Sequence, residues 1–143
     1  MKCDSSGRTL PCATETVWDG GSSGTGVCAD GHALSLGRDE GGWTPEQLLL
    51  LGAESSLMEA VLMAARNAGI DVLGYISSGH LDVPDEAGAA PRLQLNPCVV
   101  VASVDEAQRK ALLSPAVAEA SLVGRLLGAH LQVGIDVRLE PSA

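Results

Sequence analysis

The sequence predicts an α+β fold built around one long, buried helix. Residues 48–68 are apolar on more than one side of nearly every turn, which is typical of a helix enclosed by protein. Segments with the alternating polarity of strands lie before and after it, and there is no internal repeat or second domain. We therefore expect a flexible N-terminal tail over residues 1–12 and a single domain over residues 13–143.

Three short strands are expected ahead of the helix. Residues 13–18 and 25–29 alternate enough to form strands, and the glycine-rich segment 19–24 indicates a turn between them. A second turn at Asp30-Gly31 leads into a third strand at residues 32–36. The first part of the domain is therefore expected to be β structure.

The long helix has clear start and stop signals. Thr44 can cap it through its hydroxyl, Pro45 suits the first helical position, and Gln47 completes a capping box. Gly69 supplies the flexible backbone that ends it. Its length of 21 residues approaches that of a membrane span, but the flanks lack a basic bias and four polar residues interrupt it: Glu54, Glu59, Arg66 and Asn67. We therefore expect a central helix of a soluble protein.

Two strands and two further helices are expected after the long helix. Residues 72–83 and 92–103 read as strands joined by a polar loop, and Pro97 predicts a sheet edge or bulge in the second of them. Asp105-Glu106-Ala107 opens a helix that Ser114-Pro115 ends, and Pro115 starts another that reaches about Leu127. An alternating strand over residues 132–140 closes the fold.

Composition excludes several classes of partner. Nine basic and eighteen acidic residues give a net charge of −9, which disfavours nucleic acid and an anionic membrane surface. One Tyr, two Trp and no Phe offer no stacking platform for single strands. The first eight residues lack the apolar core of a signal peptide, so a cytoplasmic location is expected.

Cysteine and histidine are placed without the spacing of metal or redox motifs. The four cysteines contain no Cys-x-x-Cys pair, so we expect free thiols, with a Cys3/Cys12 disulfide as the alternative. Cys28 and Cys98 lie in expected strands, where a buried inert thiol is usual and a relocated reactive thiol is the alternative. The three histidines are isolated, so the sequence predicts no metal site and no cofactor: His32, His80 and His130.

The start of the long helix carries a family motif. Thr44-Pro45-Glu46-Gln47-Leu48 resembles the (N/T)PE(Q/E)L motif of the OsmC/Ohr superfamily, the osmotically induced and organic hydroperoxide resistance proteins, and the resemblance extends from about Ala13 to Glu140. It implies an intertwined homodimer in which curved antiparallel sheets wrap two long central helices, with the reactive site at the subunit interface. In the family a peroxidatic cysteine follows the motif and a second cysteine opens a later helix. Ser56 and Ser121 stand at these two positions.

The missing thiols change the expected chemistry. A peroxidatic residue must be a soft nucleophile with a thiolate fraction at neutral pH, and a serine hydroxyl is essentially unionised. Ser56 has no histidine nearby in sequence to activate it, so a small polar wall residue is the expected role. The family also pairs Glu46 with an arginine from an early loop, for which Arg38 is the only early substitute before the helix. As an alternative, Glu46 is a first-turn acid that the helix dipole favours.

Glu54 is the second carboxylate of interest. It interrupts the apolar helix on the face that also carries Leu50 and Met58, so it must be paired or have a raised pKa. General acid or base work is one interpretation. A salt bridge across the dimer to Arg66 or Arg125 is the other.

Three hypotheses for function follow. The first is an OsmC-like homodimer that has lost thiol-peroxidase chemistry and binds, or transforms by acid/base chemistry of an isomerase or cyclase type, a small apolar organic molecule in the interface pocket. Glu46 and Glu54 are its candidate catalytic groups, with Ser56 and Ser121 at the family cysteine positions. The second is a hydroperoxide-reducing peroxidase seen as a Cys-to-Ser form, and the third is a non-catalytic structural or regulatory dimer.

Overall fold

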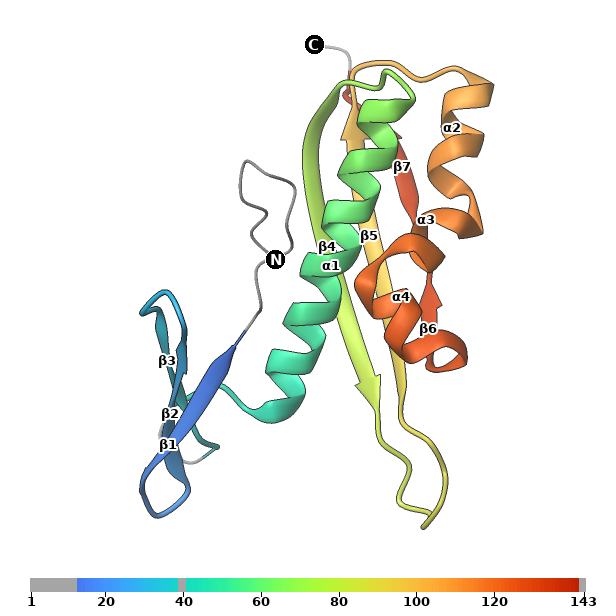
Figure 1. Ribbon diagram of the computed structural model, residues 1–143. Helices are drawn as coiled ribbons and strands as arrows, with labels where there is room; N and C mark the ends of the chain where they lie inside the picture. Colours follow the sequence, from blue (N-terminus) through green and yellow to red (C-terminus); the bar gives the residue numbers. More distant parts are fainter. Residues whose placement is uncertain (1–12, 39–40, 142–143) are drawn as a thin grey trace. The chain divides into compact units, whose positions relative to one another are not determined.

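The computed structural model describes residues 13–38 and 41–141, which form two compact units (Figure 1). One unit comprises the described residues up to Leu48 and the other those from Leu49 onward, and each is treated separately. The predicted tail, with Cys3 and Cys12, lies outside the described residues. The extent of the single domain stays a prediction.

The first unit is a three-stranded antiparallel sheet in the order β1-β2-β3. Its strands are β1 (Thr14–Gly20), β2 (Ser23–Cys28) and β3 (Ala33–Leu36), which confirms the three strands predicted there. The first turn is tighter than predicted, because Gly20 pairs with Ser23 and only Gly21 and Ser22 lie between them. Gly20 and Gly21 have φ of 111° and 56°, a backbone region that favours glycine.

The second unit contains a mixed sheet. Its strands are β4 (Val72–Asp82), β5 (Arg92–Val101), β6 (Leu131–Val133) and β7 (Asp136–Leu139). β4 is antiparallel to β5, whereas β6 and β7 pair in parallel with β5, so this sheet is mixed where the family resemblance implied antiparallel sheets. The strand predicted over residues 132–140 is two short strands, β6 and β7, which share one register against β5, and the gap between them at Gly134 and Ile135 lies opposite Asn96 and Pro97, where Pro97 has no N–H to donate.

Pro97 lies in a central strand and not at an edge or bulge. β5 has partners on both sides, and Pro97 is buried and pairs regularly with Ser77 of β4. β6 pairs with Leu93–Leu95 and β7 with Cys98–Val101, so Pro97 falls in the gap between these two partners. The missing N–H is tolerated there because no parallel ladder continues past it.

The long helix is α1 (Pro45–Asn67), and both of its predicted end signals are confirmed. The Gln47 N–H donates to Thr44 Oγ1 at 3.2 Å, and the Thr44 N–H donates to Gln47 Oε1 at 2.9 Å, which is a reciprocal capping box. At the other end Gly69 has φ of 70°, and the N–H groups of Gly69 and Ile70 donate to the carbonyls of Arg66 and Ala65. This is a Schellman motif.

Two glycines of this region predict opposite effects on stability. Gly69→Ala places a side chain at positive φ and is expected to lower the free energy of unfolding by about 1 kcal/mol. Gly52→Ala is the matched control, since Gly52 lies inside α1 with no atom within 4 Å of an added Cβ, and it is expected to raise stability by about 0.5–1 kcal/mol. Urea unfolding of both variants tests the pair, and a stabilised Gly69→Ala protein contradicts the assignment of the motif.

Three short helices follow β5 along the chain. α2 (Glu106–Leu113) begins with a capping box between Asp105 and Gln108, and α3 (Pro115–Ala120) begins at the predicted proline. The second helix was predicted to reach about Leu127, but it breaks at Ser121, which has ψ of 152° and starts a separate helix, α4 (Leu122–Leu127). A single 3-10 turn over Gly128–His130 then leads into β6.

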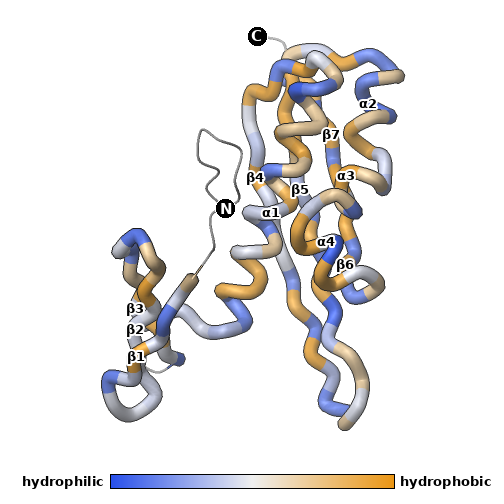
Figure 2. The backbone as a smooth tube through the Cα atoms, viewed as in Figure 1, coloured by the Kyte–Doolittle hydropathy of each residue, from blue (hydrophilic) through white to orange (hydrophobic). Residues whose placement is uncertain are grey.

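The core of the second unit lies between one face of α1 and the sheet. Apolar residues recur along α1 and β5 in Figure 2. The buried members come from α1, β5 and the short helices: Ala53, Leu57, Val61, Ala65, Leu93, Leu95, Val99, Val101, Leu112, Val117 and Val123. Among the described helices, α1 alone is long and apolar enough to cross a membrane by length and composition. Within the described chain α1 is buried along one row only, Ala53, Leu57, Val61 and Ala65, and 22% of its apolar window is buried, so the prediction of a helix enclosed on more than one side is not met by the single chain.

Candidate functional site

Glu46 forms an ion pair in the first unit. It lies in the first turn of α1, and the Arg38 guanidinium donates from Nη2 to Glu46 Oε1. The Arg38 hydrogen bond, followed by the backbone N–H of Glu46, holds the pKa of the Glu46 carboxyl below its usual value of 4.5. The structure thus pairs the carboxylate with the arginine that the sequence offered as a substitute, while a catalytic role for Glu46 stays a prediction.

Removing Arg38 is expected to raise the pKa of Glu46. A lowered folded-state pKa contributes stability that is present above the unfolded value and is lost as pH falls through the folded value. The difference in stability between wild type and Arg38→Ala should therefore be present at neutral pH and vanish well below the usual Glu pKa of 4.5. NMR titration of the Glu46 carboxyl measures the shift, with Arg66→Ala as the control, and an unchanged Glu46 titration in Arg38→Ala contradicts the pairing.

Ser56 and Ser121 come together at the start of α4. Ser56 Oγ, on α1, accepts a hydrogen bond from the Val123 N–H at 3.2 Å. Ser121 Oγ accepts one from the next N–H of the chain, that of Gly124, at 3.0 Å, and donates to the Ala118 carbonyl at 2.6 Å. Ser56 and Ser121, which the sequence motif predicted to stand at the family cysteine positions, are therefore neighbours across the contact between α1 and α4.

Both hydroxyls satisfy backbone groups in this cluster. Ser121 is buried, with 3% of its surface exposed, and serves as the N-cap of α4. Gly124 is needed beside it, because a Cβ there would lie 2.0 Å from the Ala118 carbonyl oxygen. Across the described part of the chain, no His, Lys, Asp or Glu side chain hydrogen-bonds to Ser56. The arrangement therefore caps a helix and provides no base that would activate a serine nucleophile.

Glu54 faces β4, where it belongs to a second polar cluster. A Cβ built on Gly79 would lie 2.9 Å from Glu54 Oε1, so the carboxylate lies against the bare backbone of this glycine. Tyr75 and Ser77 share the face of β4 with Gly79, because side chains alternate along a strand. Glu54 Oε1, the Tyr75 hydroxyl and Ser77 Oγ are all buried, with no hydrogen-bond partner among the residues that the structure describes. We call Glu54, Tyr75 and Ser77 the β4 polar cluster.

The electrostatics of the β4 polar cluster keep its phenol neutral. Burial, and after it the negative charge of Glu54, raises the pKa of Tyr75 to about 12. Tyr75 is therefore a hydrogen-bond donor at neutral pH. Within the described residues Glu54 has no ion pair with Arg66 or Arg125, and the salt bridge across a dimer stays a prediction.

The four predicted site residues do not form one constellation in the second unit. Glu54 and Ser56 are two positions apart on α1, about 200° around the helix, so they contact different elements. Glu46 belongs to the first unit. Sequence reasoning missed Tyr75 and Ser77. The sequence does show them as every second residue of a predicted strand, Tyr75, Ser77 and Gly79, but the family motif lies on the helix and does not include them.

The two cysteines predicted to lie in strands are both described by the structure. Cys28 and Cys98 are free, half-buried thiols, and the Cys28 thiol donates to the Asp30 carboxylate. Whether either thiol is reactive stays a prediction. Over residues 13–38 and 41–141, no three His, Cys, Asp or Glu side chains group in a way that could hold a metal ion.

Comparison with solved structures defines the fold class. The OsmC-like protein of Mycoplasma pneumoniae matches with a TM-score of 0.76 at 17% identity, over 94% of this chain and 100% of that chain. An OsmC-like protein of unknown function from Vibrio cholerae matches with a TM-score of 0.75 at 12% identity, over 89% of this chain and 99% of that chain. No protein-family profile and no curated protein matches the sequence.

The same fold includes proteins named for hydroperoxide resistance. The organic hydroperoxide resistance protein OhrB of Bacillus subtilis matches with a TM-score of 0.65 at 17% identity, over 90% of this chain and 98% of that chain. This chain is therefore an α+β protein with the OsmC-like fold, as the sequence motif predicted.

Proposed function

We propose that this protein is a divergent member of the OsmC/Ohr superfamily, a cytoplasmic homodimer that has lost thiol-peroxidase chemistry. In this proposal it binds or non-oxidatively transforms a small apolar organic molecule in a pocket at the dimer interface. The observation that carries the proposal is that the hydroxyl oxygens of Ser56 and Ser121 accept hydrogen bonds from the backbone N–H groups of Val123 and Gly124 in the first turn of α4. The positions that match the family thiols hold hydroxyls with a structural role.

The chemistry of oxygen and sulfur supports this proposal. Peroxide reduction by a thiol needs a thiolate that attacks the peroxide oxygen and a second thiol that resolves the product as a disulfide. A serine pair supplies neither step, because its hydroxyls are unionised at neutral pH and form no disulfide. Gly124 also fits the cap tightly, which favours a sequence adapted to Ser121 over one changed at two positions.

The β4 polar cluster supplies groups for acid/base work. Glu54 has a carboxylate oxygen that no described residue hydrogen-bonds, and Tyr75 is a neutral phenol that can donate a hydrogen bond. A carboxylate that takes a proton beside a donor that holds a substrate oxygen is the minimum set for an isomerase- or cyclase-type step. In the proposal Glu54 acts as the acid or base and Tyr75 positions the substrate.

Glu54→Leu distinguishes this role from a structural salt bridge. Because Glu54 Oε1 is buried and unsatisfied, its replacement by an apolar side chain is expected to raise the free energy of unfolding by about 1 kcal/mol. The matched control is Glu59→Leu, an exposed position of the same helix, with an expected change within about 0.5 kcal/mol. A clear loss of stability in Glu54→Leu would instead support a salt bridge to a partner subunit.

The function itself is tested on protein purified from its own host. Native mass spectrometry reports the oligomer and any co-purified molecule, and an organic hydroperoxide consumption assay with a dithiol reductant reports peroxidase turnover. A dimer that carries an apolar ligand and shows no turnover supports the proposal. Turnover that is abolished by Cys28→Ser or Cys98→Ser overturns it and shows that the reactive thiol has moved.

A further inference from the structure

The second unit contains a surface cavity that the β4 polar cluster does not line, although Ala118 and Gly124, whose backbone groups hydrogen-bond to Ser121 Oγ, are among its lining residues. Its volume is about 420 Å³, within the range of small-molecule sites, and it lies where α3 and α4 meet β6. None of Glu54, Tyr75 and Ser77 lines it. An inference about this cavity therefore stands apart from the proposed acid/base function.

Most of the side chains that line the cavity are aliphatic, and Ser114 and Glu119 are the two polar ones. Leu131, Val133 and Ile135 supply apolar side chains from β6 and the residues after it, and Pro115 and Ala118 supply them from α3. Gly128 adds room, since a Cβ built on it meets no atom within 4 Å. The cavity therefore suits an apolar body, which gains free energy by leaving water.

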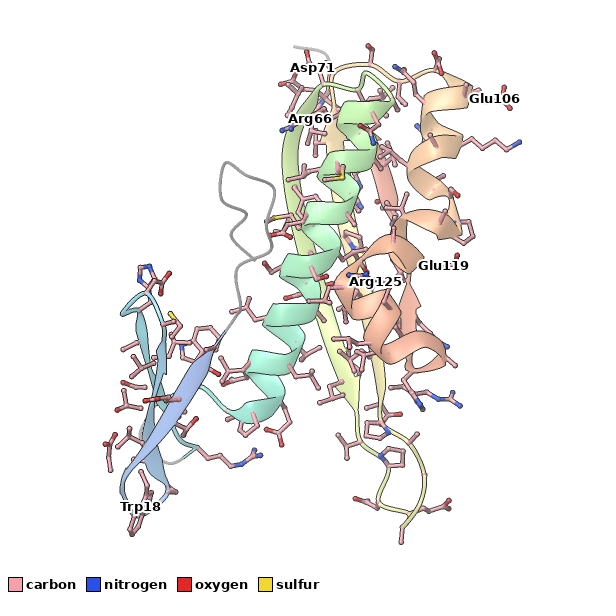
Figure 3. All side chains as sticks on the ribbon, in the orientation of Figure 1. Trp18, Arg66, Asp71, Glu106, Glu119 and Arg125 are labelled. Atoms are coloured by element: carbon pink, nitrogen blue, oxygen red, sulfur yellow. The ribbon has the colours of Figure 1, made fainter. Side chains whose placement is uncertain are left out.

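One carboxylate lies in this mostly aliphatic lining. Glu119 of α3 is the single charged residue among those that line the cavity, and it makes no hydrogen bond or ion pair with any residue that the structure describes. Figure 3 shows Glu119 on α3 and Arg125, the basic residue nearest to it in sequence, on α4. No ion pair joins the two. The negative charge at the cavity is therefore available to a ligand.

We propose that this cavity binds a small apolar primary amine in its protonated form. The ammonium group donates to the Glu119 carboxylate in a charge-assisted hydrogen bond, and the hydrocarbon part lies against the wall of Leu131 and Val133. An ammonium group has three donors and no acceptor, which matches a carboxylate that only accepts. The net charge of −9 adds a long-range attraction for a cation.

A matched series of ligands tests the charge requirement. Titration calorimetry at neutral pH, below micelle-forming concentrations, compares octylamine, octanol and octanoate, which share one hydrocarbon chain and differ in the head group. Octylamine is expected to bind about tenfold more tightly than octanol, and octanoate more weakly than both. Glu119→Gln should remove the preference for octylamine and leave octanol binding unchanged. Glu106→Gln, an exposed acid of α2 outside the cavity, should change neither.

A second pair of variants tests the location. Leu113 lines the cavity and is 45% exposed, so Leu113→Trp should obstruct the site without disturbing the core, and it should weaken octylamine and octanol alike. Leu126→Trp, on an exposed residue of α4 outside the lining, should have no effect. Equal affinity for octylamine and octanol, or octylamine binding that survives both Glu119→Gln and Leu113→Trp, overturns the proposal. These outcomes leave the test of Glu54 untouched.

Discussion

Replacing both Ser56 and Ser121 by cysteine is expected to create a dithiol that reduces organic hydroperoxides. Because the two hydroxyls accept hydrogen bonds from consecutive N–H groups, thiols at these positions would be neighbours. The Val123 N–H would also favour the thiolate at position 56. That thiolate would attack the peroxide, release an alcohol and become a sulfenic acid, and the second thiol would condense with it to a disulfide and water. An added dithiol would then reduce the disulfide.

The expected gain in turnover over wild type is on the order of 100-fold, because a hydroxyl is replaced by a partly ionised thiol. Thiol counting after one addition of hydroperoxide should show the loss of two thiols. The matched control pairs Ser121→Cys with Ser55→Cys, since Ser55 is exposed on the neighbouring helix position and faces another direction. A disulfide that forms equally in both double variants, or in neither, contradicts the juxtaposition of Ser56 and Ser121.

Local chemistry made most of the fold predictable. The capping box of Thr44 and Gln47 and the Schellman motif at Gly69 involve residues a few positions apart, so the sequence contains all of the interacting groups. The two breaks that sequence reasoning missed depend on distant partners. The gap between β6 and β7 lies opposite Pro97 of β5, and the Ser121 break is supported by Ser56, which binds the Val123 N–H across the interior.

Only those residues of the candidate site that align with the family motif could be predicted from the sequence. Alignment to the family motif identified Ser56 and Ser121, and the structure brings them together. The apolar periodicity of the helix singled out Glu54, but it did not predict which element the Glu54 side chain contacts. The β4 polar cluster arises because Gly79 leaves space for Glu54 beside Tyr75 and Ser77. That contact joins a helix and a strand whose relative placement no local pattern fixes.

Ser121→Ala is expected to cause the largest loss of stability among the single substitutions considered for this protein. The change removes the N-cap of α4 and leaves the Gly124 N–H without its partner at a buried position, while the Ala118 carbonyl keeps only the hydrogen bond from the backbone N–H of residue 121. Loss of a cap costs about 0.5–2 kcal/mol, and a buried group left unsatisfied adds to this, so we expect a decrease of about 2 kcal/mol in the free energy of unfolding. For a chain of this length, the corresponding fall in Tm is roughly 4–8 °C.

Ser114→Ala is the matched control for this prediction. Ser114 also caps a short helix, α3, but its hydroxyl accepts one longer hydrogen bond, from the Ala116 N–H at 3.3 Å, and is only half-buried. Its loss should cost about 0.5–1 kcal/mol. Urea unfolding at one fixed protein concentration compares the two, since association would make stability depend on concentration. If Ser114→Ala proves as damaging as Ser121→Ala, the buried double hydrogen bond of Ser121 does not stabilise the junction of α3 and α4 in the way the structure implies.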